Sequence, residues 1–293
     1  MLEIIRKRAS ETHPDVIFTQ DTFADKYLRK IQEEIQNNVP CSEFSLSKVN
    51  IQGTDSVSIF VNTRKFEVVN VDREARMVLE QQRRTKLNFL EETRYVVLQA
   101  TSKTSGEKIL LSSFHGKNNK ASNGLKDELI RDFLIFTDLL AKKLKLEAIL
   151  IGTDINRDMK SFSSGLPANI SVFDFEFPDM CPTQCKRKAK PVIDYFLHSA
   201  ALAPIYSSAR RFQEDETVLD HHPIHIVFQV SFIVKHLLDI KHLIVILIVQ
   251  YLTSDSLLSR SRKACQKDLG TKRLSLEQPT SRREISTRWA KET

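Results

Sequence analysis

The pattern of apolar and polar positions predicts a chain in which buried strands alternate with amphipathic helices. A short unbroken apolar run, residues 148–151, predicts a strand that is covered on both faces. Before it, Leu125 to Lys145 has apolar residues at helical spacing and predicts the clearest helix of the chain. Lys108 to Phe114 predicts the strand before this helix. The succession of strand, helix and strand predicts a crossover that lays the two strands parallel, with both carboxyl ends at one rim.

The rest of the first 230 residues mixes helices and strands in the same way. Apolar residues at helical spacing predict helices, and short apolar or alternating runs predict strands. The predicted elements are helices at Leu2–Ser10 and Asp25–Gln36, and strands at Val16–Thr19, Ser56–Phe60, Phe66–Val71, Thr93–Thr101, Pro191–Leu197 and Ile224–Val230. Residues 37–50 and 159–190 predict irregular connections, and 73–86 fits either an exposed helix or a long connection. The pattern as a whole predicts an α/β fold, and a chain of 293 residues can form either one large domain or two small ones.

The segment 231–253 is strongly apolar and predicts a helix that either packs on the domain or is poorly ordered. It contains Lys235, Asp239 and Lys241, and each charge at the centre of a membrane would cost about 2.5–3.5 kcal/mol. Its unbroken apolar run, Leu243 to Val249, is far shorter than the roughly 20 residues that a membrane-spanning helix needs. We therefore expect no membrane span here.

Residues 254–293 form a basic, serine-rich tail that predicts disorder, because it has too few apolar residues to fold alone. Ten basic and five acidic residues give this tail a net charge of +5. The whole chain carries +7, which leaves only +2 for the part before the tail. A nearly neutral folded part gives weak support for a basic groove that would bind nucleic acid.

Cysteine usage and the N-terminus indicate the compartment. The cysteines lack the spacing of a zinc site or of a disulfide framework; they are Cys41, Cys181, Cys185 and Cys265. The N-terminus has no apolar stretch of the kind found in signal peptides. We therefore expect an intracellular protein with reduced thiols.

Polar residues at the ends of the two parallel strands are the first candidates for chemistry. Asp154 and Asn156 stand two apart at the end of a strand, so their side chains would point the same way. Such a pair could orient a water molecule and bind a phosphoryl oxygen. The alternative is an Asx-type turn with no further role. His115 ends the neighbouring strand, where a single histidine is more often a half-buried surface residue.

Further acids and histidines belong to other predicted strands. Asp194 lies inside an apolar strand and needs a partner there. An imidazole N–H from His221 or His222 would satisfy it, and Asp220 precedes these histidines. Asp21 follows the strand that starts at Val16, where it is either an acid at the tip of the strand or the N-cap of the next helix.

In this order the motifs resemble the endonuclease/exonuclease/phosphatase superfamily, with its deoxyribonuclease-I-like fold. The five motifs are Val16–Asp21, His115-Gly116, Ile151–Asn156, Ile193–Tyr195 and Asp220–Ile224. The resemblance covers roughly residues 1–230. It implies a four-layered α/β (α+β) sandwich, in which two mainly antiparallel β-sheets are flanked by helices. It also implies metal-dependent hydrolysis of phosphodiesters or phosphomonoesters.

The resemblance implies a role for each catalytic candidate. Asp154 would position or deprotonate the attacking water, Asn156 would hold the scissile phosphate, and His115 would lie near the leaving oxygen. His221 would bind phosphate, with Asp194 orienting it. In-line attack on phosphate needs such a fixed water, together with donors for the developing charge.

The resemblance also implies a metal site. Asp21 and Asp220 match carboxylates that bind Mg²⁺ or Mn²⁺, and hard cations prefer oxygen ligands. Asp21 stands where the family has the longer glutamate, which would draw this ligand back by one methylene.

The family has a strand before the first helix, ending in an asparagine at the metal site, whereas this chain begins at the helix. We therefore expect an N-terminally truncated domain with its first strand missing, two strands short of hydrogen-bond partners and an unrelated extension after residue 230. One interpretation is a nuclease-like phosphodiester hydrolase with impaired activity. The other is a non-catalytic, degenerate relative that at most binds phosphate-bearing partners. Either interpretation is compatible with DNA, RNA, phosphoinositide or lipid substrates, because variable loops decide that choice in the family.

Overall fold

The computed structural model describes residues 2–22, 25–40, 42–50, 56–83, 85–117, 121–158, 162, 165–168, 170–172, 193–211, 224–230 and 241–249. At positions 21, 22, 25–27, 49, 50, 56, 171, 172, 206–211, 229, 230 and 241–249 it describes the backbone alone. The chain divides into two units, Met1–Leu252 and Thr253–Thr293. The second unit, which holds the predicted disordered tail, lies outside the described residues.

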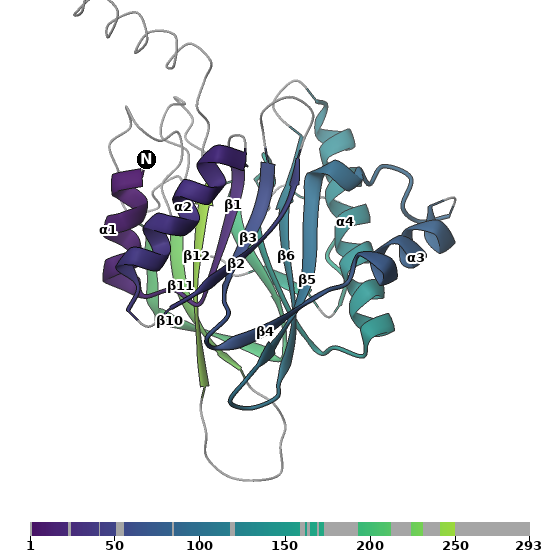
Figure 1. The fold of residues 1–293 in the computed structure, drawn as a ribbon. Coiled ribbons are helices and arrows are strands. Elements are labelled where there is room, and N and C mark those ends of the chain that lie inside the picture. The colour runs from purple at the N-terminus through teal and green to yellow at the C-terminus, as the bar shows by residue number, and fades with distance from the viewer. Residues whose placement is uncertain are drawn as a thin grey trace, which may run out of the picture. The chain divides into compact units, whose positions relative to one another are not determined.

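Two six-stranded β-sheets form the framework of the first unit (Figure 1). Sheet A has the strand order β10-β11-β12-β1-β3-β2, and sheet B has the order β4-β5-β6-β7-β9-β8. The strands of sheet A are β1 (Val16–Thr22), β2 (Phe44–Asn50), β3 (Ser56–Asn62), β10 (Leu202–Arg211), β11 (Ile224–Val230) and β12 (Lys241–Val249). Those of sheet B are β4 (Phe66–Asn70), β5 (Tyr95–Ser102), β6 (Lys108–His115), β7 (Ala148–Asp154), β8 (Ile170–Val172) and β9 (Asp194–Ser199). Among the strands that the structure describes, only the pairs β1–β12 and β6–β7 are parallel, so the predicted mainly antiparallel sheets are confirmed.

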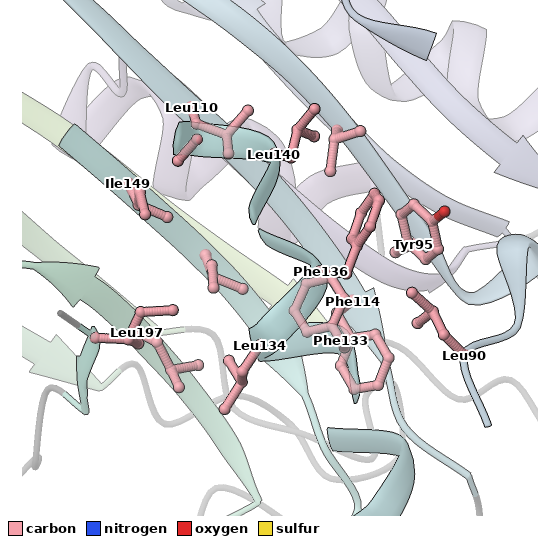
Figure 2. Packing of buried hydrophobic residues seen from close by; sticks show 14 of the residues in the cluster. Leu90, Tyr95, Leu110, Phe114, Phe133, Leu134, Phe136, Leu140, Ile149 and Leu197 are labelled. Carbon is pink, nitrogen blue, oxygen red and sulfur yellow. The ribbon is translucent and has the colours of Figure 1, made fainter. Parts of the chain in front are cut away.

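Helices cover the outer face of each sheet. Those of sheet A are α1 (Leu2–Thr12) and α2 (Asp25–Asn38), and those of sheet B are α3 (Asp72–Gln82) and α4 (Asn123–Leu144), with a short 3₁₀-helix at Glu92–Arg94. Ile5 of α1 and Leu28 of α2 join one apolar cluster with Phe60 of β3. On the other side, Phe133 of α4 stacks on Phe114 of β6 with ring centroids 4.2 Å apart, in the cluster that Figure 2 shows.

A third apolar cluster fills the space between the two sheets. Phe18 of β1, Phe196 of β9 and Phe228 of β11 belong to it, and edge-on ring contacts of 6.2 and 6.1 Å link them in that order. Helices, sheet A, sheet B and helices therefore form four layers. The predicted fold class, a four-layered α/β sandwich, is confirmed.

The crossover predicted around the longest helix forms as expected. β6 and β7 pair in parallel, with Ile109 opposite Ala148 and His115 opposite Asp154. Between them, α4 starts after Ser122, whose hydroxyl accepts a hydrogen bond from the Leu125 N–H and so caps the helix. The carboxyl ends of both strands thus meet at one rim, as the apolar periodicity indicated.

The last described strand corrects two expectations. Residues Lys241–Val249, predicted as part of an apolar helix, form β12. This strand lies between β11, to which it is antiparallel, and β1, to which it is parallel. β1 is therefore paired on both sides, with β12 and with β3, and the order of the described strands in sheet A leaves no gap, contrary to the expectation of strands short of partners. Seven of the nine residues are leucine, isoleucine or valine, a composition typical of central strands.

Three further strands were not predicted from the sequence. One is β8, which lies within residues 159–190, predicted as an irregular connection. β2 occupies part of the segment predicted as a loop, although Phe44 and Leu46 alternate there with Ser45 and Ser47. This alternation is the ordinary signal of a strand with one covered face. β10 forms an edge of sheet A by pairing with β11. None of the helices that the structure describes is long and apolar enough to cross a membrane.

Candidate active site

A row of three buried polar side chains crosses sheet B at the rim. His115 is the partner of Asp154 in the pair β6–β7, and Asp194 is the partner of Asp154 in the pair β7–β9. Residues directly opposite each other on neighbouring strands lie on the same face of the sheet. His115 is 5% exposed, Asp154 0% and Asp194 1%. The row is therefore almost fully withdrawn from bulk solvent.

This row lies on the face of sheet B that packs against sheet A. Asp154 follows Gly152 by two residues, so both are on the same face. A Cβ atom added to Gly152 would lie only 2.4 Å from the ring of Phe18 in β1, which shows that this face meets sheet A directly. Since Asp154 is the last residue of β7, the row marks the end of the space between the sheets.

Asn156 connects the residues at the end of the row. Its backbone N–H donates to Asp154 Oδ1 at 2.8 Å, and its side-chain Nδ2 lies 3.3 Å from His115 Nε2. An amide nitrogen only donates, so this contact needs Nε2 as the acceptor and the ring proton on Nδ1. His115 Nε2 also lies 3.8 Å from Asp154 Oδ2. The imidazole, the carboxylate and the carboxamide thus form one connected group.

The two loops that carry this group touch each other through their backbones. The Gly116 N–H donates to the Asp154 carbonyl at 2.7 Å. A Cβ atom at Gly116 would lie 2.3 Å from the carbonyl oxygen of Ile155, a distance that no real side chain tolerates. Glycine at this position therefore lets the loop after β6 approach the loop after β7 closely.

Gly116→Ala should consequently loosen the site. We expect an unfolding free energy lower by about 1–3 kcal/mol, as for other overpacked positions, because one loop must move to admit the methyl group. Gly124→Ala is the matched control, since nothing lies within 4 Å of a Cβ at that position in α4. Urea unfolding measures both variants. If Gly116→Ala had the same unfolding free energy as the wild type, the contact between the loops would not be tight in solution.

A cluster of charges supports the loop after β6. Arg94 Nη1 donates to the carbonyls of His115 and Gly116 at 3.5 and 3.2 Å. Glu91 contacts both Arg94 Nε and Lys117 Nζ at 2.6 Å. Burial raises the pKa of Glu91, but the hydrogen bonds from Lys117 and Arg94 outweigh it, so that the pKa lies below its usual value of 4.5. The backbone that carries His115 is thereby tied to a charged network.

This lowered pKa predicts a pH-dependent contribution to stability. The contribution is present above the unfolded pKa of about 4.5 and is lost as the pH falls through the lower folded value. We expect the wild-type protein to melt at a higher temperature than Glu91→Gln at pH 7. The difference should shrink below pH 4.5, and melting curves recorded between pH 7 and 3.5 would measure it. A difference that stays constant or grows toward acid would contradict this role of the Glu91 charge.

Gln20 is a residue of the site region to which the sequence reading gave no role. It lies on β1 and is fully buried, and its Nε2 donates to Ser113 Oγ at 2.7 Å and to the Gly152 carbonyl at 3.1 Å. These two partners stand two residues before His115 and Asp154, respectively. Gln20 therefore joins sheet A to both strands that carry the site. Its signal in the sequence is a polar residue on the inward face of an apolar strand, in register with Phe18.

The structure brings together four of the predicted site residues, His115, Asp154, Asn156 and Asp194. Asp194 lies opposite Asp154, a neighbour that the sequence reading did not foresee. Asp21 lies near the end of β1, where the structure describes its backbone but not its side chain.

Asp220 and His221 lie outside the described residues, and so does the predicted contact between Asp194 and His221. β11 begins at Ile224, opposite Leu247 of β12, and β12 ends at Val249, opposite Gln20 of β1. β11 therefore begins at the same end of sheet A at which β1 ends.

Comparison by sequence finds no relative, since no family model matches and no curated protein matches significantly. Comparison by structure finds proteins with a similar fold. Humanized TDP2 of D. rerio, with 14 mutations, matches with a TM-score of 0.56 at 15% identity, over 78% of this chain and 90% of that chain. An endonuclease/exonuclease/phosphatase of Bacteroides vulgatus matches with a TM-score of 0.53 at 10% identity, over the same shares.

The catalytic domain of human Nocturnin, with bound sulfate, matches with a TM-score of 0.50 at 15% identity, over 76% of this chain and 78% of that chain. At such low identities the likeness concerns the fold. The chain therefore has the deoxyribonuclease-I-like fold of the endonuclease/exonuclease/phosphatase proteins, as the order of the five motifs indicated.

Proposed function

We propose that this chain is a phosphoester hydrolase that cleaves phosphodiesters, with nucleic acid as its substrate class. The observation that carries the proposal is the connected group of His115, Asp154 and Asn156, buried at the rim between the two sheets. A carboxylate, an imidazole and a carboxamide supply the acceptor, the proton-transfer group and the donor that hydrolysis requires.

The proposed mechanism assigns one task to each member of this group. Asp154 orients a water molecule and takes its proton as the water oxygen attacks phosphorus. Asn156 donates from its side-chain amide to a phosphoryl oxygen, on which negative charge develops. His115 lies at the leaving side: once its imidazole has taken up a proton from solvent, it gives this proton to the ester oxygen as the bond from phosphorus to that oxygen breaks, and the proton that Asp154 took from water returns to solvent. In-line displacement of this kind depends mainly on positioning and on electrostatic stabilisation.

We also propose that this hydrolysis requires a divalent cation, Mg²⁺ or Mn²⁺. Among the residues whose side chains the structure describes, no group of three His, Cys, Asp or Glu side chains could hold a metal ion. The candidate ligands are Asp21 and Asp220, whose side chains are outside that description. A cation bound there would polarise the phosphoryl group.

Two structural neighbours suggest nucleic acid as the first substrate to try. One is D. rerio TDP2 complexed with single-strand DNA product, with a TM-score of 0.52 at 14% identity over 75% of this chain and 86% of that chain. The other is ANGEL2, a 2′,3′-cyclic phosphatase, with a TM-score of 0.50 at 15% identity over 68% of this chain and 74% of that chain.

The test is hydrolysis of bis(p-nitrophenyl) phosphate, of labelled single-stranded DNA and RNA, and of supercoiled plasmid. Each reaction is run with Mg²⁺, with Mn²⁺ and with excess EDTA. We expect turnover that needs the cation and disappears in Asp154→Ala, while Glu80→Gln on the exposed face of α3 leaves it unchanged. No turnover of any substrate above the Asp154→Ala background would favour the non-catalytic interpretation.

A further inference from the structure

We propose that Lys126 is a positioning residue of the candidate active site, which holds the loop after β7 so that Asn156 stays beside His115. Lys126 lies in the first turns of α4, one layer outside the strands that carry the site. The sequence reading assigned it no function. The inference rests on the proposed function for its catalytic consequence, whereas its structural consequence can be measured without any activity.

The burial of Lys126 is the first observation. Only 5% of this residue is exposed, although lysine is almost never buried without a partner because its ammonium group loses hydration. Its Nζ donates to the backbone carbonyl of Asn156 at 3.0 Å. A buried charge is thus directed at the backbone of a residue in the candidate site.

The conformation of Asn156 is the second observation. Its φ angle is +53°, in the left-handed region that asparagine occupies more readily than most residues with a side chain. The backbone contacts around Asn156 stabilise this conformation. Asp154 holds the N–H of Asn156 at 2.8 Å, and Lys126 holds its carbonyl. Both backbone groups of this residue are therefore fixed, which determines the direction of its side chain toward His115.

The neighbouring residues repeat the arrangement. Asp127 follows Lys126 in α4, and Arg157 follows Asn156 in the loop. Arg157 donates to both carboxylate oxygens of Asp127, at 2.8 and 3.4 Å, a bidentate geometry that fixes orientation. The hydrogen bond and the charge of Asp127 raise the pKa of Arg157. Two consecutive residues of the helix thus hold two consecutive residues of the loop.

Replacement of the ammonium group tests the proposal in the full-length chain. Lys126→Met keeps an unbranched side chain only one atom shorter but removes its charge and its donors. Since a misplacement of about 1 Å can cost on the order of 100-fold in rate, we expect kcat on bis(p-nitrophenyl) phosphate to fall about 10- to 100-fold. KM should change less than about 3-fold, because the position of the loop affects the geometry of the reacting groups more than it affects the binding of the substrate. Lys142→Met, an exposed lysine of the same helix that pairs with Asp138, is the matched control.

A second readout does not depend on hydrolysis. The side-chain amide signals of Asn156 in a ¹H–¹⁵N spectrum are identified by their loss in Asn156→Ser. We expect Lys126→Met to shift these signals toward those of an unstructured asparagine, and Lys142→Met to leave them in place. If the wild-type protein shows no turnover, the proposed function fails, while these signals still decide the role of Lys126.

If Lys126→Met does not fold, Lys126→Gln is tested in its place with the same two readouts. Its polar head suits a site that is polar in the wild type, but it is one atom shorter and uncharged, so the same changes are expected at smaller size. Amide signals of Asn156 and a kcat that both match the wild type in a folded Lys126 variant would overturn the proposal. A fall in melting temperature alone, with both readouts unchanged, would overturn it as well, because it would show a purely structural role.

Discussion

Val245→Pro is expected to prevent the first unit from folding. Val245 lies in the middle of β12, opposite Val16 of β1 and Ile226 of β11. Proline has no N–H to give to a ladder, and it is found in sheets only at edges, first positions or bulges. Disrupting a central strand leaves buried backbone groups on β1 and β11 unpaired, at about 1–3 kcal/mol for each group. A few such groups approach the whole stability of a typical domain, roughly 5–15 kcal/mol.

Near-ultraviolet circular dichroism and thermal unfolding would measure this effect. Ending the chain after Leu252 is the control, because it keeps β12 and removes only the second unit; this variant should melt as the full chain does. Ending the chain after Ile240 removes β12 and should reproduce the loss of structure seen with proline. A cooperative melt of Val245→Pro at the wild-type temperature would contradict the pairing of β12 with β1 and β11.

Asp154→Asn is expected to keep the fold and to abolish most of the activity. Asparagine retains an oxygen that can accept the hydrogen bond from the Asn156 N–H, so the turn at the end of β7 should persist. It has no carboxylate to take a proton from water. Removal of a general base typically costs about 10²- to 10⁴-fold in rate, and we expect kcat on a small phosphodiester to fall by that factor.

The measurement pairs kcat with the melting temperature of the same preparation. Asp72→Asn, an exposed acid at the start of α3 that accepts from Asn70, is a matched carboxylate-to-amide control and should leave kcat within about 2-fold of the wild type. A fully active Asp154→Asn protein would remove Asp154 from the role of base. It would leave its buried position opposite His115 and Asp194 as a structural feature.

Local periodicity was enough to predict the part of the fold that carries the site. The helical spacing of apolar residues in α4, and the apolar runs of β6 and β7 on either side of it, define a crossover within about 50 residues. Right-handed parallel crossovers place the ends of both strands at one rim. For this reason His115 and Asp154 could be expected side by side from the sequence.

Contacts between distant parts of the chain were decided by the tertiary structure. The apolar residues of β12 are compatible with a buried helix as well as with a central strand, since short apolar runs do not distinguish the two. What selects the strand is the pairing offered by β11 and β1, and β1 lies more than 200 residues earlier in the chain. No local pattern encodes such a partner. The prediction of a helix, and of an unpaired position in the sheet, was wrong for this reason.

The same division holds within the candidate site. The sequence by itself determined which residues end the strands, because a polar residue after an apolar run marks the rim of a sheet. It did not determine that Asp194 lies opposite Asp154, that Gln20 bridges the sheets, or that Lys126 reaches the carbonyl of Asn156. These contacts depend on strand register and on the packing of one layer against another. A side chain's neighbours across layers follow from the whole arrangement of the chain, whereas its own face follows from the few residues on either side of it.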